Sequence, residues 1–314
     1  MRLLNLLTAC VALLLGTASV QAQLMPRAIG EWEATAAFRA LDRPNPQETN
    51  VVIFREEGSG ATLLDSNTLV DLNIGLGPDI AFSTTREDGL DYELRFFFTN
   101  FSRSTLTQAD SITSPFFTGG VLTTREVNGS YTSDMFNIEL NQKRIFNQYV
   151  RLLHGIRFMH IEEELEFLST GVLTAAPATG FTASSVSRAK NPMLGYQLGG
   201  ESRIVLVPGM DMEGYFKCGI YNNFSNQSTS QSVNLLPGTV VSSGSENELG
   251  LVSDFGVKFH LNVVDNFMSI FAGYDGMYVN SFAAAPANVN LSNSVVNDLD
   301  FWLHGITFGL KVVR

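Results

Sequence analysis

The chain has 314 residues, of which 45% are hydrophobic and only 16% are charged, whereas an ordinary soluble domain has roughly 25% charged residues. Its formal net charge of −11 argues against nucleic-acid binding, because phosphate contacts require clustered Lys and Arg. The shortage of charge indicates that something other than water covers much of the surface, as lipid covers the wall of a membrane β-barrel.

The N-terminus has the features of a secretory signal peptide. Arg2 precedes a short apolar stretch, and a small-x-small pattern ends at Ala22, where signal peptidase is expected to cut. We therefore predict a signal peptide over residues 1–22 and an outer-membrane domain over residues 23–314. A lipoprotein box ending at Cys10 is the alternative, but the apolar run continues past that cysteine.

Two further features of the remaining sequence narrow the fold class. After the signal peptide, no stretch has the 18 or more apolar residues of a membrane-spanning helix, so a helical membrane protein is excluded. Cys218 is the single cysteine left, which excludes an internal disulfide.

Alternation of apolar and polar residues predicts strands long enough to cross a membrane at a tilt. In the first of them, Trp32 and Phe38 share one face and Glu33 and Arg39 share the other. A helix has a period of 3.6 residues and could not bury an apolar face with this pattern. In chain order, the predicted strands are Glu31–Leu41, Ile74–Thr84, Asp91–Phe101, Tyr131–Gln142, Tyr149–Ile161, Asn191–Glu201, Met210–Tyr221, Glu248–His260, Phe267–Val279 and Phe301–Val313.

The predicted strand that starts at Tyr149 is the least regular. Its apolar face also carries His154 and His160, which leaves the register open by one residue.

The links between these strands alternate between long and short. The long links are Asp42–Asn73, Ser102–Ser130, Glu162–Lys190, Asn222–Asn247 and Asn280–Asp300. The short links are Thr85–Leu90, Lys143–Gln148, Ser202–Gly209 and Asn262–Asn266. An even-stranded, up-and-down antiparallel barrel with both termini in the periplasm has this pattern, with tight turns inside and long loops outside. We predict ten strands; twelve, with Val51–Arg55 added, and a soluble β-sandwich are the alternatives.

Short motifs along the chain resemble a bacterial outer-membrane β-barrel porin family, from about Ile74 to the C-terminus. They are GPDIAFSTTREDGLDYELRFF from Gly77, FNIELN from Phe136, LLHGIRFMHIEEEL from Leu152, FKCGIYNN from Phe216, ELGL from Glu248 and the closing HGITFGLKVVR. The resemblance implies an outer-membrane barrel and a pore, and it brings no catalytic or binding residues. The chain departs from the usual pattern at its end, where Val313 and Arg314 replace the aromatic residue that the barrel insertion machinery reads.

The polar faces of the strands predict a charged lumen. The expected acids are Asp91, Glu93, Glu139, Asp211, Glu213, Glu248 and Asp254, and the expected bases are Arg39, Arg95, Arg151, Arg157, Lys217, Lys258 and Lys311. The two sets balance at seven each. Because a barrel of about eight strands is just filled by its side chains, we expect these groups to form a paired plug. A narrow gated channel lined by them is the alternative.

Two other groups of residues stand near the predicted ends of strands. Trp32 begins the first strand and Trp302 begins the last, so we expect them at opposite rims, as in the aromatic belts at membrane interfaces. Glu162, Glu163, Glu164 and Glu166 cluster where the fifth strand leaves the membrane. They are expected to form a solvated strand end; a site for divalent cations that bridge lipid head groups is the alternative.

Signatures of catalysis are missing from the sequence. It has no G-x-S-x-G motif, no paired metal-ligand spacing and no phosphate-binding loop, and no Asp lies within two residues of a His. We therefore expect no enzyme, no cofactor and no bound metal. The predicted function is a narrow pore in the outer membrane of a Gram-negative envelope, which transports small solutes or ions by passive diffusion. The alternative is a closed-lumen barrel that displays its outer loops. The expected partners are outer-membrane lipid and the insertion machinery, with small solutes added if the lumen is open.

Overall fold

The computed structural model describes residues 31–43, 52–56, 62–65, 74–86, 90–113, 122–147, 149–173, 179–234, 238–264, 267–288, 295 and 299–314. The predicted signal peptide and its cleavage site lie outside these residues. No helix among them is long and apolar enough to cross a membrane.

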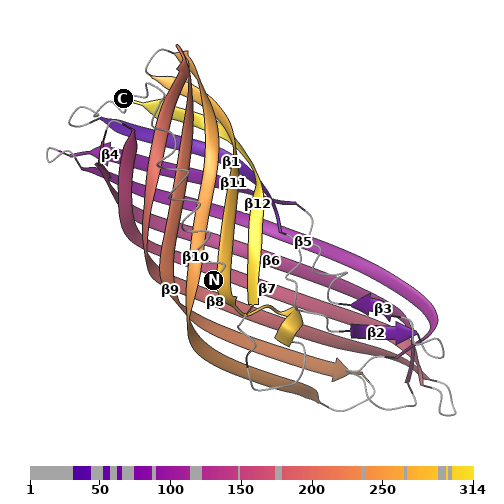
Figure 1. The fold of residues 1–314 in the computed structure, drawn as a ribbon. Helices are drawn as coiled ribbons and strands as arrows, with labels where there is room; N and C mark the ends of the chain where they lie inside the picture. Colours follow the sequence, from indigo (N-terminus) through magenta and orange to yellow (C-terminus); the bar gives the residue numbers. More distant parts are fainter. Residues whose placement is uncertain are drawn as a thin grey trace.

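Ten strands in the described part of the chain close into one antiparallel barrel (Figure 1). They are β1 (Trp32–Asp42), β4 (Gly75–Thr85), β5 (Asp91–Thr113), β6 (Leu122–Ile145), β7 (Val150–Leu173), β8 (Thr179–Val207), β9 (Met210–Val233), β10 (Thr239–Val264), β11 (Met268–Phe282) and β12 (Leu299–Val313). Sequential strands pair with each other, and β1 pairs with β12 to close the wall. The predicted ten-stranded barrel is confirmed, and every predicted strand segment lies on one of these strands except for the first residue of four of them: Glu31, Ile74, Tyr149 and Phe267.

The segment Val51–Arg55, which would have belonged to a twelve-stranded barrel, lies largely in a small separate hairpin. Strands β2 (Val52–Glu56) and β3 (Thr62–Asp65) pair with each other, and β2 pairs with the far end of β5. The wall closes through β4 and β5 without them. The hairpin therefore stands beside the barrel and adds no strand to it.

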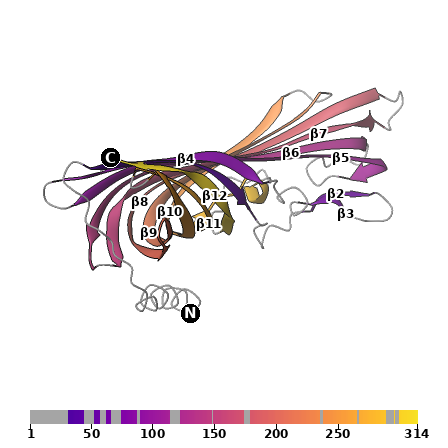
Figure 2. The same cartoon turned by 90° about the horizontal axis from the view of Figure 1, so that it is seen from above.

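Three of the long links are mostly strand rather than loop. The hairpins β5–β6, β7–β8 and β9–β10 continue as paired strands far beyond the level at which β1 and β4 end. Figure 2 shows the ends of β5, β6 and β7 projecting well past β12. We call this part the extension, and its end of the barrel the extended end. Residues such as Ser225–Asn234 are polar on both faces, so they have no hydrophobic alternation that would predict a strand.

We call the opposite end of the barrel the turn end. It carries the short connections, the start of β1 and the end of β12. The backbone N–H of Trp32 donates to the carbonyl oxygen of Arg314 at 2.7 Å there. Between β8 and β9 the chain reverses within two residues, and Gly209 has a φ of 84°, which glycine adopts without steric cost.

The pairing register fixes the width of the barrel. The path of paired residues from Glu33 on β1 around the wall to Phe301 on β12 returns to β1 twelve positions beyond its start. Ten strands with this stagger tilt by about 40° and, at about 4.8 Å spacing, enclose a backbone cylinder of about 10 Å radius. Side chains that reach inward from opposite walls nearly fill a cylinder of that size.

The outer surface of the wall is an apolar belt. Every barrel strand contributes large apolar side chains whose exposed fractions lie between 37% and 65%: Phe38, Ile80, Leu94, Ile138, Ile156, Leu198, Ile220, Phe259, Ile270 and Phe308. On β7 the belt runs from Val150 to His160, which at this tilt corresponds to a height of about 25 Å, the height of a membrane barrel's lipid-facing band.

The belt also settles the open register of β7. His154 lies on the lipid-facing side with Leu152 and Ile156, and its Nδ1 is 2.8 Å from the hydroxyl oxygen of Tyr196 on β8. The apolar face assigned to this strand from the sequence, which includes His154, is therefore the outer face of β7, with no shift by one residue.

Candidate functional site

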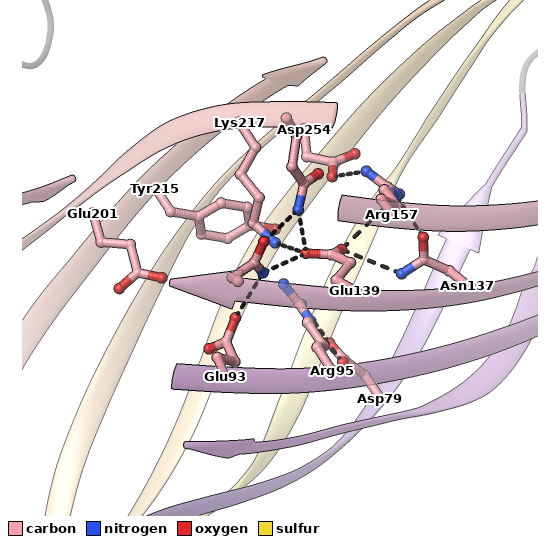
Figure 3. A network of polar contacts seen from close by, with 12 residues as sticks. Asp79, Glu93, Arg95, Asn137, Glu139, Arg157, Glu201, Tyr215, Lys217 and Asp254 are labelled. Atoms are coloured by element: carbon pink, nitrogen blue, oxygen red, sulfur yellow. Dashed lines mark hydrogen bonds and ion pairs between the residues drawn. The ribbon is translucent and has the colours of Figure 1, made fainter. Parts of the chain in front are cut away.

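The lumen is the candidate functional site, and an ion network fills its middle (Figure 3). Glu139 on β6 accepts hydrogen bonds from Lys217 Nζ at 2.6 Å and from Gln197 Nε2 at 3.0 Å. Arg157 on β7 donates to Asp254 on β10 at 2.5 Å. The β7–β10 and β6–β9 pairs each join strands three places apart in the wall, so their side chains span the lumen.

A second part of the network centres on two carboxylates. Asp79 on β4 accepts hydrogen bonds from Arg39 at 2.8 Å and from Arg95 at 2.6 Å. Asp275 on β11 accepts one from the Tyr215 hydroxyl at 2.7 Å. All five side chains are nearly buried, and buried charges of this kind persist only when they are paired and hydrogen-bonded.

At the turn end, the network opens into a small cavity. Lys143 bridges Glu93 at 2.5 Å and Glu201 at 2.6 Å, and Lys311 pairs with Glu33 at 3.0 Å. The cavity beside these pairs has a volume of about 60 Å³. The side chains nearest the turns keep a little exposure, 15% for Glu33 and 16% for Glu201, so the cavity faces the turn end.

At the extended end, a buried arginine crosses almost the full width of the lumen. Arg43 follows β1, and its Nη1 donates to Glu163 on β7 at 2.5 Å and to Ser133 on β6 at 2.8 Å. Its guanidinium lies 4.5 Å from the ring centroid of Phe301. β1 and β7 are four places apart in a ten-stranded wall, so this pair links nearly opposite sides.

Apolar side chains surround that pair and fill the lumen at the same level. The cluster includes Leu41, Phe97, Phe101, Tyr131, Met135, Met159, Ile161, Leu165, Phe167, Met193, Tyr221, Met277, Val279, Phe282 and Leu303, none of them more than 4% exposed. A cluster of this many buried apolar side chains leaves little free space inside the barrel wall.

The segment after β11 folds inward and caps the cluster. Ala283, Ala284 and Ala285 are buried, and a 3-10 turn at Pro286–Asn288 follows. Asn191 of β8 accepts from the Ala283 N–H at 2.8 Å and donates to its carbonyl oxygen at 2.7 Å. The Ala285 N–H donates to Glu163 at 2.9 Å, which joins the cap to the Arg43 pair.

The structure places every predicted lumen residue on the inward face. Eleven of the fourteen are buried: Arg39, Asp91, Glu93, Arg95, Glu139, Arg157, Asp211, Lys217, Asp254, Lys258 and Lys311. Arg151, Glu213 and Glu248 keep partial exposure. Arg151 lies 3.5 Å from Asp91, and Arg203 donates to Asp211 at 2.8 Å.

Sequence reasoning missed several charged lumen residues. Asp79 and Asp275 lie on the polar faces of predicted strands, so a count of every charged residue on those faces would have included them. Glu201 ends a predicted strand, and Lys143 is the first residue of a predicted short link; the strand alternation still holds at both positions. Arg43 lies beyond a strand end, and no sequence pattern marks it as a lumen residue.

The two tryptophans lie at opposite ends of the wall. Trp32 is at the turn end, stacked on Phe82 at 6.2 Å between ring centroids. Trp302 stands near the start of β12, where its ring centroid is 4.9 Å from that of Tyr278 and 6.4 Å from that of Phe255.

The glutamate cluster is divided between two faces, and Glu162, Glu163 and Glu164 each pair with a base. Glu162 pairs outward with Lys190 at 2.8 Å and Glu164 pairs with Arg188 at 2.9 Å. Glu163 points inward to Arg43. Within the described residues, no group of three or more His, Cys, Asp or Glu side chains is arranged to hold a metal ion. The paired state favours the solvated strand end over the cation site.

No family model matches the chain, and a search of curated proteins gives no match. Membership of the porin family therefore stays a prediction. Among solved structures, the outer membrane protease OmpT from Escherichia coli is similar at 12% identity, covering 95% of this chain and 100% of that chain, with a TM-score of 0.43. The translocator domain of the autotransporter NalP from Neisseria meningitidis is similar at 11% identity, covering 92% and 90%, with a TM-score of 0.40.

A major outer membrane protein from Thermus thermophilus is also similar, at 8% identity over 90% of this chain and 99% of that chain, with a TM-score of 0.36. Likenesses this distant carry no argument about function. The closed strand order and the outward apolar belt are what give this chain the architecture of a membrane β-barrel.

Proposed function

We propose that the protein is an integral barrel of the bacterial outer membrane whose lumen is closed, and that its extension acts at the cell surface as an interaction platform. The cleavable signal peptide over residues 1–22 belongs to this proposal, because outer-membrane proteins are exported before they insert. So does the orientation, with the turn end in the periplasm and the extension outside, since short turns face the periplasm in this class.

The observation that carries the closed lumen is that side chains from strands three or four places apart meet across it at two levels. Arg157 reaches Asp254 in the middle, and Arg43 reaches Glu163 at the extended end. A solute crossing the barrel would have to separate both pairs and displace the apolar cluster that fills the lumen around the Arg43 pair. Breaking a buried pair costs several kcal/mol each time, roughly 3–5 kcal/mol by analogy with other proteins.

A narrow pore for small solutes or ions is the second candidate. The cavity at the turn end favours it, because it is polar and opens to one side. With a volume of about 60 Å³ it has room for only a few waters. Conduction would require the central network to rearrange, so this candidate is a gated pore rather than an open one.

The platform is supported by the length of the extension. Strands β5 to β10 run for 23 to 29 residues, about twice the 11 residues of β1 and β4. About 9–11 residues suffice to cross the membrane, so the remaining half of each strand stands clear of the belt. Ser, Thr, Asn and Gln dominate this part, which suits contact with water and with a polar partner.

Planar-bilayer recording of the refolded protein tests the closed lumen. We expect no steady conductance from the wild type, and more frequent openings from Arg43→Ala/Glu163→Ala. The control is Lys190→Ala/Glu162→Ala, an exposed pair at the same level of the wall, which should behave as wild type. Heat modifiability on unboiled gels shows that each variant is folded. A large, steady wild-type conductance would reject the closed lumen in favour of the pore.

Labelling of intact cells tests the orientation. In a Cys218→Ser background, Ser228→Cys places a thiol on the exposed face of the extension and Asn147→Cys places one in a turn. A membrane-impermeant maleimide should label the first variant and leave the second unlabelled until the cells are lysed. The reverse pattern would refute the proposed orientation.

A further inference from the structure

The cavity at the turn end contains polar groups that the ion network does not use. Its wall carries six Lys and Arg side chains against five Asp and Glu, although the chain as a whole has a net charge of −11. Each of the five carboxylates has a cation within 4.0 Å. Two of the cations, Lys143 and Lys311, serve two carboxylates each. Because two cations pair with four of the carboxylates, one cation of the cavity wall has no carboxylate within ion-pair distance.

Lys258 on β10 is that cation. Only 9% of the residue is exposed, and its ammonium group lies 5.3 Å from the ring centroids of both Tyr215 and Phe271. Within the described residues these rings are its close contacts, and no carboxylate lies near enough to form an ion pair with it. Its cross-strand neighbour Glu213 lies 3.7 Å from both Lys311 and His260 and acts on Lys258 only from beyond ion-pair distance.

His260 stands two residues further along the same strand and faces the same cavity. The residue is 2% exposed, and neither ring nitrogen has a hydrogen-bond partner among the described residues. Its Nε2 lies 3.7 Å from Glu213, beyond hydrogen-bond distance. A buried imidazole without a partner is costly, so it needs a group that the protein itself does not supply.

The spacing of these two side chains suits a small tetrahedral anion. Residues two apart on one face of a strand are separated by about 6.6 Å, which an oxyanion spans when it accepts a hydrogen bond from each side. The cavity volume of about 60 Å³ is enough for about four or five waters or for one ion of that size. The two carboxylates deeper in the barrel, Asp79 and Asp275, already accept from Arg95 and Tyr215.

We propose that the turn-end cavity binds a small oxyanion with the size and charge of inorganic phosphate, held between Lys258 and His260. The anion would supply the counter-charge for the unpaired ammonium group and an acceptor for the imidazole. Because the cavity is enclosed by the barrel wall, a free ion fits it better than the phosphate of a lipid head group. The site does not depend on a closed lumen, since the same groups would face the same space in a gated pore.

Calorimetric titration of the refolded barrel with inorganic phosphate, in a neutral maltoside detergent at constant ionic strength, tests the site. We expect wild-type protein to bind phosphate, Lys258→Met to lose at least about tenfold in affinity, and His260→Phe to be weakened. Lys190→Met, which removes an exposed lysine, is the matched control and should bind as wild type. Failure of the wild type to bind at millimolar phosphate, or unchanged binding by Lys258→Met, would overturn the proposal.

Thermal unfolding gives a second readout that does not require the variant to bind. Without phosphate, Lys258→Met should unfold at a higher temperature than wild type, because it removes a buried charge that has no partner. Phosphate should raise the unfolding temperature of the wild type alone. Stabilisation by calcium instead of phosphate would overturn the proposal. Stabilisation by phosphatidylglycerol micelles without free phosphate would support the same anion chemistry and assign it to a lipid head group.

Discussion

Replacing Arg43 with methionine should destabilise the barrel by about 3 kcal/mol, although the residue lies just beyond the end of a strand. The ion pair with Glu163 is 2.5 Å long, and the exposed fractions of the two side chains are 1% and 0%. At an effective dielectric constant of about 20, the attraction is worth about 7 kcal/mol, which is opposed by a desolvation cost of several kcal/mol per ion. The substitution removes the attraction and leaves Glu163 buried and charged, a change that typically costs about 3–5 kcal/mol.

The lower end of that range is expected because the pair is incompletely satisfied. Nε and Nη2 of Arg43 have no hydrogen-bond partner among the described residues, so the guanidinium already carries part of its desolvation cost in the folded protein. The loss is softened further because Glu163 keeps the hydrogen bond from the Ala285 N–H at 2.9 Å.

A double-mutant cycle measures the pair directly. The unfolding free energy is obtained from urea titration of the refolded barrel, followed by the fluorescence of Trp32 and Trp302 and by heat modifiability. The double variant Arg43→Met/Glu163→Met should lie within about 1 kcal/mol of wild type or above it, because two apolar side chains replace two buried charges. A single Arg43→Met that loses less than about 1 kcal/mol would show that water reaches Glu163, and the cap at the extended end would then not be closed.

Two further predictions concern the wall itself. Ile156→Arg puts a charge in the middle of the apolar belt and should cost about 2–4 kcal/mol of unfolding free energy in lipid vesicles. Leu168→Arg, on the same face but beyond the belt, should cost less than about 1 kcal/mol. Equal costs would show that the membrane does not lie at the level of the belt. Gly77→Ala should impair assembly, because a Cβ there would overlap the carbonyl oxygen of Phe98. Gly180→Ala should assemble as wild type, because the atom nearest to its added Cβ is 3.9 Å away. The fraction of heat-modifiable protein after refolding measures assembly in both variants.

Cross-lumen pairing gives this narrow barrel a way to combine a polar inner face with a closed interior. A strand that is apolar toward lipid must turn its alternate residues inward, and in a wall of about 10 Å radius those residues meet. Charged side chains there are tolerated when each finds a partner, as Glu139 does with Lys217 and Asp79 with Arg95. Among the described lumen residues, Lys258 is the exception that makes the turn-end cavity a candidate binding site.

The strands and their inward faces could be predicted from the sequence because the two-residue period is a local property of the chain. Wherever one face meets lipid and the other meets the lumen, alternation is enforced residue by residue, and it placed Glu139 and Arg157 correctly. The same alternation failed in the extension of β9, where the inward residues Ser225, Gln227 and Thr229 are buried but are as polar as the outward ones, so that burial alternates along the strand and hydrophobicity does not. Those residues were expected to be loops.

Which charges meet was decided by the tertiary structure alone. Arg43 and Glu163 are separated by 120 residues, and only barrel closure with its stagger brings them together. Lys258 is indistinguishable by sequence from Lys217, yet Lys217 has a carboxylate at 2.6 Å and Lys258 has aromatic rings. Periodicity tells which side of the wall a residue faces. The partner depends on register summed over ten strands, and this sum is not written in any local stretch of sequence.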